Sequence, residues 1–329
     1  MSNQYYAEMI GTGHAVPPRI LTNQDLEKIV DTSDEWIVTR TGIRERHIAD
    51  KNTFASTLGT EAAKKAIEEA DIRVDEIDLI VVATVTPDMP FPSTAAIIQK
   101  KLNVPKTAVM DISAGCTGYI YALSIAESYI KTGAFKTALV IGVELLSRVT
   151  DWSDRSTCVL FGDGSGAAVL RATTERKGVL GTYINGDGRL GDLLKMPGGG
   201  SMNPASEESI ANRLHYLKMS GNEVFKFAVN MMGEASEKIL EKTGIRKEEI
   251  GMLVPHQANV RIINATAKKL NLPPEKVYIN IHRFGNTSSA SIPIAVDEIR
   301  KNGKFENANP MILVAFGAGF TWGSAAISW

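Results

Sequence analysis

DISAGCTGY, residues 111–119, joins an apolar run typical of a strand to a long pattern typical of a helix, residues 119–131. This connection puts Cys116 on a turn beside the N-terminus of a helix. The free N–H groups and the positive end of a helix favour an anion at that point. A thiol there can have its pKa lowered toward neutrality, and the thiolate is the nucleophilic form. The stretch therefore predicts a reactive cysteine on a strand-to-helix turn.

Two residues far downstream fit such a nucleophile. His256 lies in VPHQAN, residues 254–259, and Asn286 lies in FGNTS, residues 284–288. Cysteine nucleophiles are often served by histidine and asparagine residues that are distant in sequence and close in the fold. Taken singly, each of the three has an ordinary alternative, which is a packing cysteine, a core histidine or a turn asparagine. Taken together, they favour a catalytic set.

Strands alternate with helices along most of the chain, which indicates an α/β protein. The two halves also repeat one another, since KKLN occurs at residues 100–103 and again at 268–271. At a similar spacing of about 170 residues, Cys116 corresponds to Asn286. This order and spacing indicate an internal duplication rather than chance similarity. We therefore expect Cys116 and Asn286 on equivalent turns that meet at the centre of one shared core.

Composition limits the possible classes of function. The 329 residues suggest about two units, predicted at 1–174 and 175–329, and the net charge of −1 favours neither nucleic acid nor a membrane surface. Cys116 and Cys158 lack the spacing of a metal site or a disulfide framework, and we expect Cys158 in the core. No apolar run approaches the roughly 18 residues of a spanning helix. We expect a cytoplasmic protein without metal or redox cofactor.

Ordered motifs run along the chain: DEWI at 34–37, RTGIRER at 40–46, FPS at 91–93, GC at 115–116, FGDG at 161–164, GNEVF at 221–225, HQAN at 256–259, GNTS at 285–288 and GAGFTWG at 317–323. Together they resemble the β-ketoacyl-acyl carrier protein synthase III family from end to end. The resemblance implies the thiolase fold, in which duplicated halves form a five-layered αβαβα architecture. It also implies a homodimeric acyltransferase that starts type II fatty-acid synthesis.

The reaction implied by the resemblance is a decarboxylative Claisen condensation. An acyl-CoA primer acylates Cys116, and malonyl-acyl carrier protein then loses CO2 and attacks the acyl group to give 3-ketoacyl-acyl carrier protein. The backbone N–H groups of Cys116 and Gly319 would form the oxyanion hole. His256 and Asn286 would donate hydrogen bonds to the enolate that decarboxylation leaves. No cofactor is implied, because acyl-CoA is a substrate.

The resemblance also assigns substrate contacts. Trp36 and Arg155 would stack on the adenine of CoA, and Arg40 would contact its phosphates or its pantetheine. Phe91 would reach across the dimer interface and bound the acyl pocket of the partner. The remaining contacts would be Asn222 and Asn259 with the pantetheine arm, and Arg261 and Lys226 with the acidic carrier protein.

Several alternatives stay open at this point. Condensing enzymes of secondary metabolism, such as quinolone or polyketide starter enzymes, chalcone-synthase-like enzymes and hydroxymethylglutaryl-CoA synthases, share the Cys-His-Asn set. A catalytically silent synthase subunit is a further alternative, although it would be expected to lose the nucleophile. A degradative thiolase is disfavoured because residues 317–320 lack a second cysteine.

Two points are not fixed by the sequence. The primer is open among acetyl, propionyl and branched acyl groups, because one methylene in an apolar pocket is worth only about 1–3 kcal/mol. His282 stands where the family motif has an aspartate. It would replace an outer hydrogen-bond partner, alter the protonation of the site, or point outward.

Overall fold

The computed structural model describes residues 5–303 and 308–329. Within them, nine strands form one mixed sheet in the order β11-β12-β13-β8-β1-β7-β6-β4-β5. The strands are β1 (Tyr6–Ala15), β4 (Leu79–Ala83), β5 (Ala108–Ile112), β6 (Thr137–Leu145), β7 (Asp163–Thr173), β8 (Gly178–Gly186), β11 (Met252–Pro255), β12 (Met311–Gly317) and β13 (Thr321–Ser328). Two small ribbons pair β2 (Ile20–Thr22) with β3 (Glu45–His47), and β9 (Leu194–Lys195) with β10 (Lys218–Met219).

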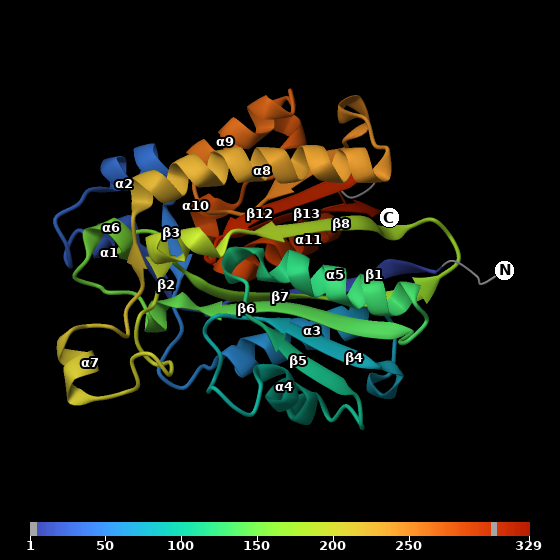
Figure 1. Ribbon diagram of the computed structural model, residues 1–329, viewed down its shortest axis with the longest axis horizontal. Coiled ribbons are helices and arrows are strands. Elements are labelled where there is room, and N and C mark those ends of the chain that lie inside the picture. Colours follow the sequence, from blue (N-terminus) through green and yellow to red (C-terminus); the bar gives the residue numbers. More distant parts are fainter. Residues whose placement is uncertain (1–4, 304–307) are drawn as a thin grey trace.

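The large sheet consists of two leaves. A single residue pair, Ala7 with Val179, joins β1 to β8 and therefore connects them. Helices lie outside and between the leaves, as Figure 1 shows from α8 and α9 at the top to α3 and α4 at the bottom. The helices are α1 (Asn23–Leu26), α2 (Asp34–Thr41), α3 (Ala55–Glu69), α4 (Thr94–Leu102), α5 (Gly118–Lys131), α6 (Arg155–Cys158), α7 (Glu207–Ala211), α8 (Gly221–Thr243), α9 (Val260–Lys269), α10 (Ile281–Phe284) and α11 (Ser291–Lys301).

Helices α5 and α11 form the central layer between the two leaves (Figure 1). Every residue of α11 from Ser291 to Ile299 is buried, and α5 buries Tyr119, Ile120 and Leu123 against the same core. A helix that is buried all round belongs to a protein interior. The order of layers is therefore helix, sheet, helix, sheet, helix, and the predicted thiolase fold is confirmed.

Each central helix begins just after one of the predicted site turns. The short 3₁₀ helix η2 (Gly115–Thr117) carries Cys116 and runs into α5, whereas η7 (Ser288–Ala290) follows Asn286 and runs into α11. The predicted boundary between residues 174 and 175 falls in the connection between β7 and β8. The division of the chain into two units at that boundary stays a prediction.

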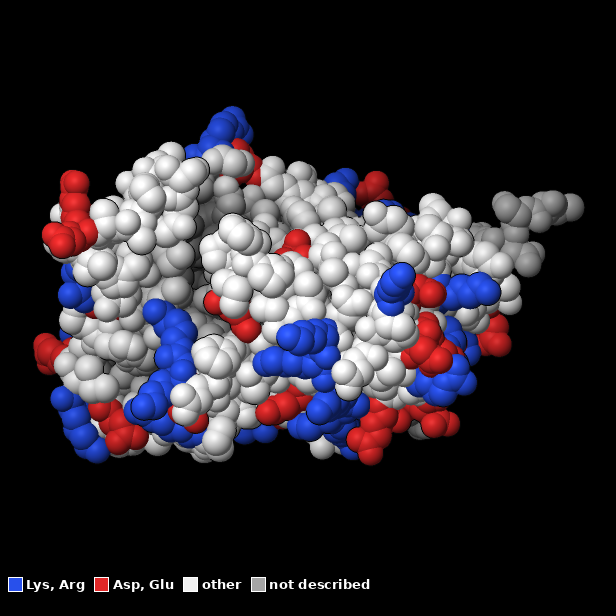
Figure 2. Space-filling view, turned by 90° about the horizontal axis from the view of Figure 1, so that it is seen from below, with Lys and Arg blue, Asp and Glu red and all other residues white. Residues whose placement is uncertain are grey.

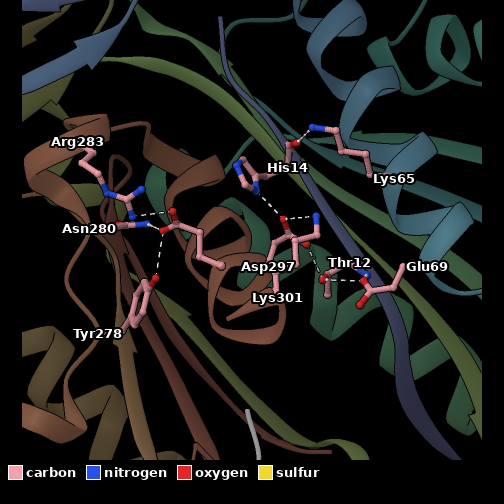
Figure 3. Close-up of polar contacts among 10 residues, drawn as sticks. Thr12, His14, Lys65, Glu69, Tyr278, Asn280, Arg283, Asp297 and Lys301 are labelled. Atoms are coloured by element: carbon pink, nitrogen blue, oxygen red, sulfur yellow. Dashed lines mark hydrogen bonds and ion pairs between the residues drawn. The ribbon is translucent and has the colours of Figure 1, made fainter. Parts of the chain in front are cut away.

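A buried carboxylate ties α11 to β1 (Figure 3). Asp297 accepts from the Thr12 hydroxyl at 2.7 Å and from Lys301 Nζ at 2.8 Å, and its other contact is His14 Nδ1 at 2.5 Å. Burial raises the pKa of Asp297, but the hydrogen bonds from His14, Lys301 and Thr12 outweigh it and lower the pKa to about 2. Asp297 is therefore a carboxylate across the neutral pH range, and in this form it holds the central helix α11 to β1.

We expect Asp297→Ala to lower the free energy of unfolding by about 3 kcal/mol or more, because it leaves buried polar partners without their acceptor. Asp192→Ala is the matched control, since Asp192 is 89% exposed in its pair with Lys195. That control should change stability by about 0.5 kcal/mol or less. Urea unfolding at one protein concentration measures both. Equal losses in the two variants would show that the Asp297 network does not hold the layers together.

Candidate active site

Cys116, His256 and Asn286 lie on the wall of one cavity of about 140 Å³. Cys116 comes from the turn after β5, His256 directly follows β11, and Asn286 precedes η7. Residues that are 140 or more positions from Cys116 in the sequence thus meet at the centre of the fold. The structure brings the predicted set together at the end of the central helix layer.

Close backbone contacts with the glycine-rich loop 317–319 position Cys116. A Cβ on Gly317 would lie 2.5 Å from the Cys116 backbone nitrogen, and a Cβ on Gly115 would lie 2.6 Å from the Ala318 nitrogen. Gly115 also has φ +54°, a conformation that glycine adopts without strain. Glycine at these two positions therefore lets the turn that carries the thiol pack directly on the loop.

The thiol of Cys116 does not have the lowered pKa that its place beside a helix suggested. Burial raises its pKa to about 12, with the nearby Glu144 adding to the rise and a hydrogen bond from Ser288 opposing it. The helix α5 begins two residues later, at Gly118. Desolvation of the charged form outweighs the favourable helix end. The prediction of a pKa lowered toward neutrality is therefore wrong, because burial raises the pKa of Cys116 instead.

His256 is buried and neutral. Its Nδ1 lies 2.7 Å from the hydroxyl of Ser291, the first residue of α11. Burial lowers the pKa of His256 to about 3, so the ring carries no charge near neutral pH. With Nδ1 occupied by Ser291, the other ring nitrogen is left for the cavity that His256 lines.

The backbone around Asn286 fixes its side chain. The Asn286 N–H donates to the Leu160 carbonyl at 2.9 Å, and the Asn286 carbonyl accepts from the Gly162 N–H at 3.0 Å. Its Oδ1 accepts from the Ser288 N–H at 2.8 Å. Because the amide oxygen is held in this way, the NH2 group remains to donate within the cavity. The site thus offers two neutral donors, from His256 and Asn286.

The glycine-rich loop contributes differently from the prediction. Gly317 and Ala318 line the cavity, whereas Gly319 is not among the lining residues. Gly319 has φ +138°, and a Cβ there would meet Thr321 at 2.9 Å. Glycine at position 319 is therefore explained by backbone conformation, and the Ala318 nitrogen lies close to Gly115 in the Cys116 turn.

The predicted CoA residues cluster on α2 and α6. The guanidinium carbon of Arg40 lies 4.4 Å from the Trp36 ring centroid, and that of Arg155 lies 5.1 Å from it. Arg155 also donates to the Asp31 carbonyl at 2.8 Å. The Trp36 ring thus has cation–π contacts with both guanidinium groups.

The two predicted pantetheine residues differ in their surroundings. Asn259 lines the cavity, but its Oδ1 caps α9 through the Arg261 N–H at 2.8 Å and its Nδ2 donates to the Arg40 carbonyl at 2.9 Å. One amide hydrogen of Asn259 is left for a ligand. Asn222 is exposed in the first turn of α8 and is not among the lining residues.

The predicted surface residues are exposed. Arg261 lies over the ring of Phe225, which lines the cavity, at 5.3 Å, and Lys226 is the next residue of α8. Phe91 is 84% exposed and does not line the cavity of its own chain. His282 is exposed on α10 and outside the cavity, so it points outward, whereas Cys158 is fully buried in the core as predicted.

Sequence reasoning missed most of the cavity wall and the residues behind it. The wall is apolar and comes from separate segments, whose side chains include Val85, Leu146, Leu160, Leu217 and Met219. Ser288, the last residue of the GNTS motif, lines the cavity, and Ser291 lies three residues further on; the sequence assigned a role to neither. No periodic sequence pattern marks the residues of the cavity wall, because they come from separate segments of the chain.

No helix in residues 5–303 or 308–329 is long and apolar enough to cross a membrane. In the same residues, no group of three or more His, Cys, Asp and Glu side chains is placed to hold a metal ion.

Comparisons with known proteins match the whole chain. Two family models match, 3-oxoacyl-[acyl-carrier-protein] synthase III at residues 110–188 and its C-terminal part at residues 240–329. A β-ketoacyl-[acyl-carrier-protein] synthase III of Caldanaerobacter subterraneus subsp. tengcongensis is 52% identical over 100% of this chain and 99% of its own. The crystal structure of the Aquifex aeolicus 3-oxoacyl-[acyl-carrier-protein] synthase III is 49% identical, with a TM-score of 0.91 over 98% of this chain and 100% of that one. A priming β-ketosynthase of a polyketide pathway is 32% identical, with a TM-score of 0.91 over 100% of this chain and 97% of that one.

Proposed function

Because this chain belongs to the 3-oxoacyl-[acyl-carrier-protein] synthase III family, it is a condensing enzyme that starts fatty-acid synthesis, and we propose how its residues divide the reaction. The enzyme condenses acyl-CoA with malonyl-acyl carrier protein. The observation that carries the assignment of residues is the single cavity lined by Cys116, His256 and Asn286. Cys116 is the nucleophile, and the two others are donors.

In the first half-reaction the sulfur of Cys116 attacks the thioester carbon of the primer. The oxygen of the tetrahedral intermediate accepts from the Cys116 N–H and, we propose, from the Ala318 N–H in place of that of Gly319. Ala318 lines the cavity beside the nucleophile, which supports this choice. The CoA sulfur leaves with its electron pair, and a thioester on Cys116 replaces the one on CoA at little energetic cost.

In the second half-reaction the malonyl group loses CO2 and its thioester becomes an enolate. His256 and Asn286 donate to the enolate oxygen, where charge develops. The α-carbon attacks the acyl group on Cys116, and the Cys116 sulfur leaves with its electron pair and takes up one proton from the solvent, which restores the resting thiol. Neutral donors suit this step, because burial lowers the pKa of His256 and keeps it uncharged. Because His256 carries no charge, it does not neutralise the enolate, which stays reactive toward the acyl group on Cys116.

Trp36 carries the CoA contact, and Arg40 and Arg155 both lie against its ring. We expect Trp36→Ala to raise KM for acyl-CoA about tenfold and to change kcat by less than about twofold, since the contact binds ground state and transition state alike. Tyr129→Ala is the control, because Tyr129 is an exposed aromatic whose ring makes a tilted contact with Phe135 instead. Steady-state kinetics at saturating malonyl-acyl carrier protein measures both. An unchanged KM for acyl-CoA in Trp36→Ala would show that Trp36 does not contribute to CoA binding.

Other contacts follow from exposed residues near the cavity. Asn222 and Asn259 meet the pantetheine arm, and Arg261 and Lys226 meet the acidic carrier protein, mainly by speeding its encounter. The enzyme works in the cytoplasm, where thiols such as Cys116 are kept reduced.

The enzyme forms a homodimer across the β5 edge of the sheet. An uncovered edge strand is a template for pairing, and β5 ends the strand order with only partly buried residues. Figure 2 views the molecule from the side of α4 and β5 and shows a wide uncharged area between basic and acidic side chains. The exposed Phe91 and Met89 lie in the loop before α4. In the dimer Phe91 bounds the partner's acyl pocket.

A condensation assay tests this function. The purified protein is mixed with malonyl-acyl carrier protein and one primer at a time, which is acetyl-, propionyl-, isobutyryl- or octanoyl-CoA. The mass of the acyl carrier protein product is then measured by mass spectrometry. We expect a 3-ketoacyl product two carbons longer than the primer for at least one short acyl-CoA. No product with any primer would contradict the proposed division of the reaction among these residues.

A further inference from the structure

Behind the nucleophile lies a buried carboxyl group that the reaction described above does not use. Glu144, in β6, is 0% exposed. Its Oε2 accepts from the Val85 N–H at 3.1 Å and from the Thr86 hydroxyl at 2.6 Å. The Thr86 hydroxyl itself accepts from the Leu145 N–H at 2.8 Å, so its hydrogen is free to point at Glu144. The Thr84 hydroxyl lies 3.4 Å from the same oxygen, so each group around Oε2 can donate a hydrogen bond to it.

The other oxygen of Glu144 meets two serine hydroxyls in addition to a longer contact with the Val85 N–H at 3.3 Å. Oε1 lies 3.2 Å from the Ser288 hydroxyl and 2.9 Å from the Ser289 hydroxyl. The Ser289 hydroxyl also lies 3.0 Å from the Ala83 carbonyl, which can take its hydrogen. A hydroxyl both donates and accepts, so Oε1 can be either a carboxylate oxygen or a proton-bearing one. Its surroundings accommodate both protonation states.

Ser288 connects this oxygen to the nucleophile. Both residues line the cavity, and a hydrogen bond from the Ser288 hydroxyl acts to lower the pKa of the Cys116 thiol, against the effect of burial. Ser288 is held at φ +48°, a conformation that residues with a side chain rarely adopt, and its N–H is bound to Asn286 Oδ1. One serine therefore lies between the carboxyl of Glu144 and the sulfur of Cys116.

We propose that Glu144 is the proton acceptor for Cys116, acting through the Ser288 hydroxyl during acylation. This rests on the proposed role of Cys116 as the nucleophile. As the sulfur bonds to the acyl carbon, the thiol proton passes to Ser288 Oγ and the Ser288 proton passes to Glu144 Oε1. When the bond between the acyl carbon and the CoA sulfur breaks, that sulfur takes a proton from Ser288, and Glu144 returns its proton to Ser288. No net charge is added to the buried site.

The charge balance explains why such an acceptor is needed. A thiolate beside a carboxylate would place two negative charges in one buried region, and Glu144 accordingly raises the pKa of Cys116. Moving the proton to Glu144 leaves one negative charge instead. Burial raises the pKa of Glu144 to about 7, which makes the group a base matched to neutral pH. His256 is a poor base for this proton, because burial lowers its pKa to about 3.

The other charged groups nearby do not face Glu144 and Cys116. The adjoining end of β4 (Thr84 to Thr86) and η7 present hydroxyl and backbone groups to Glu144. On β7, Asp163 is turned to the Ala49 N–H at 2.7 Å and the Ser147 hydroxyl at 2.6 Å. Cys116 is the titratable group that faces Glu144 from η2. The pH dependence of acylation thus reports the Glu144–Ser288–Cys116 chain.

The test measures single-turnover acylation of Cys116 by acyl-CoA, by intact mass, between pH 5.5 and 9. The wild-type rate is expected to rise through a step near pH 7, as Glu144 ionises. Glu144→Gln keeps the shape of the side chain but cannot take a proton, so the step should vanish and the rate at pH 7.5 should fall about 100-fold. Ser288→Ala should give the same loss, and the double variant should be no slower than either single variant.

Controls separate this proposal from a structural role and from failure of the nucleophile. Glu144→Asp should retain the step, and so should Glu127→Gln, which changes a buried glutamate bound to Lys131 and Thr182 instead. A wild-type step that persists in Glu144→Gln, or a slower rate with the step unchanged, would overturn the relay. Absence of any adduct in the wild type would instead overturn the assignment of Cys116.

Discussion

Replacing Cys116 with alanine is expected to abolish condensation, with a fall in kcat/KM of about 10⁴-fold or more. Removal of a covalent nucleophile of this kind leaves only the contributions of binding and oxyanion stabilisation. The thiol faces a cavity, so its loss should leave the fold intact. Product formation from acyl-CoA and malonyl-acyl carrier protein measures the effect.

Cys158→Ala is the matched control. Cys158 is fully buried beside Leu21 and Leu26, away from the cavity. Its replacement should lower stability by about 1 kcal/mol and leave kcat/KM within about twofold, because it removes one buried sulfur from a packed core. Full condensation activity in Cys116→Ala, or equal losses in both cysteine variants, would contradict the role of Cys116.

The second large effect should separate the two half-reactions. We expect His256→Ala and Asn286→Ala each to slow condensation by about 10²–10³-fold while Cys116 is still acylated by acyl-CoA. Each variant removes one donor from the enolate, and a single donor of this kind is worth about 3–4 kcal/mol of barrier lowering. Acylation by intact mass and condensation by product mass, measured on the same preparation, distinguish the steps.

Asn230→Ala serves as the control for these variants, because Asn230 is an exposed asparagine in the middle of α8. It should retain both half-reactions. If Asn286→Ala lost acylation as strongly as condensation, Asn286 would act on the nucleophile rather than on the enolate. The same outcome for His256→Ala would move His256 to the first half-reaction.

The meeting of the catalytic set could be predicted from the sequence, because the information is local and repeated. The turn around Gly115 and Cys116 and the turn around Gly285 and Asn286 occur in similar surroundings about 170 residues apart. Alternating strands and helices then require the two turns to lie at the same end of a layered fold. The apolar run that leads into His256 fixed its place at the end of a buried strand, β11.

Other features depend on burial, which a sequence pattern does not measure. The position of Cys116 beside a helix predicted a lowered pKa, whereas the enclosed site raises it. The resemblance named Gly319 as a backbone donor, and that role stays a prediction, whereas the structure places Gly317 and Ala318 on the cavity wall. The sequence around Glu144 indicates only a strand residue, and its burial follows from the packing of β4 and η7 against β6. Each of these depends on segments that only the fold brings together.

Intact-protein mass spectrometry with a panel of acyl-CoAs tests the central claim most directly. Wild type and Cys116→Ala are each mixed with acetyl-, propionyl- and branched acyl-CoAs, and the adduct is located by peptide mapping. Our account predicts a mass increase of one acyl group on Cys116 in the wild type and none in Cys116→Ala. An adduct on another residue, or an equal adduct in both proteins, would contradict it.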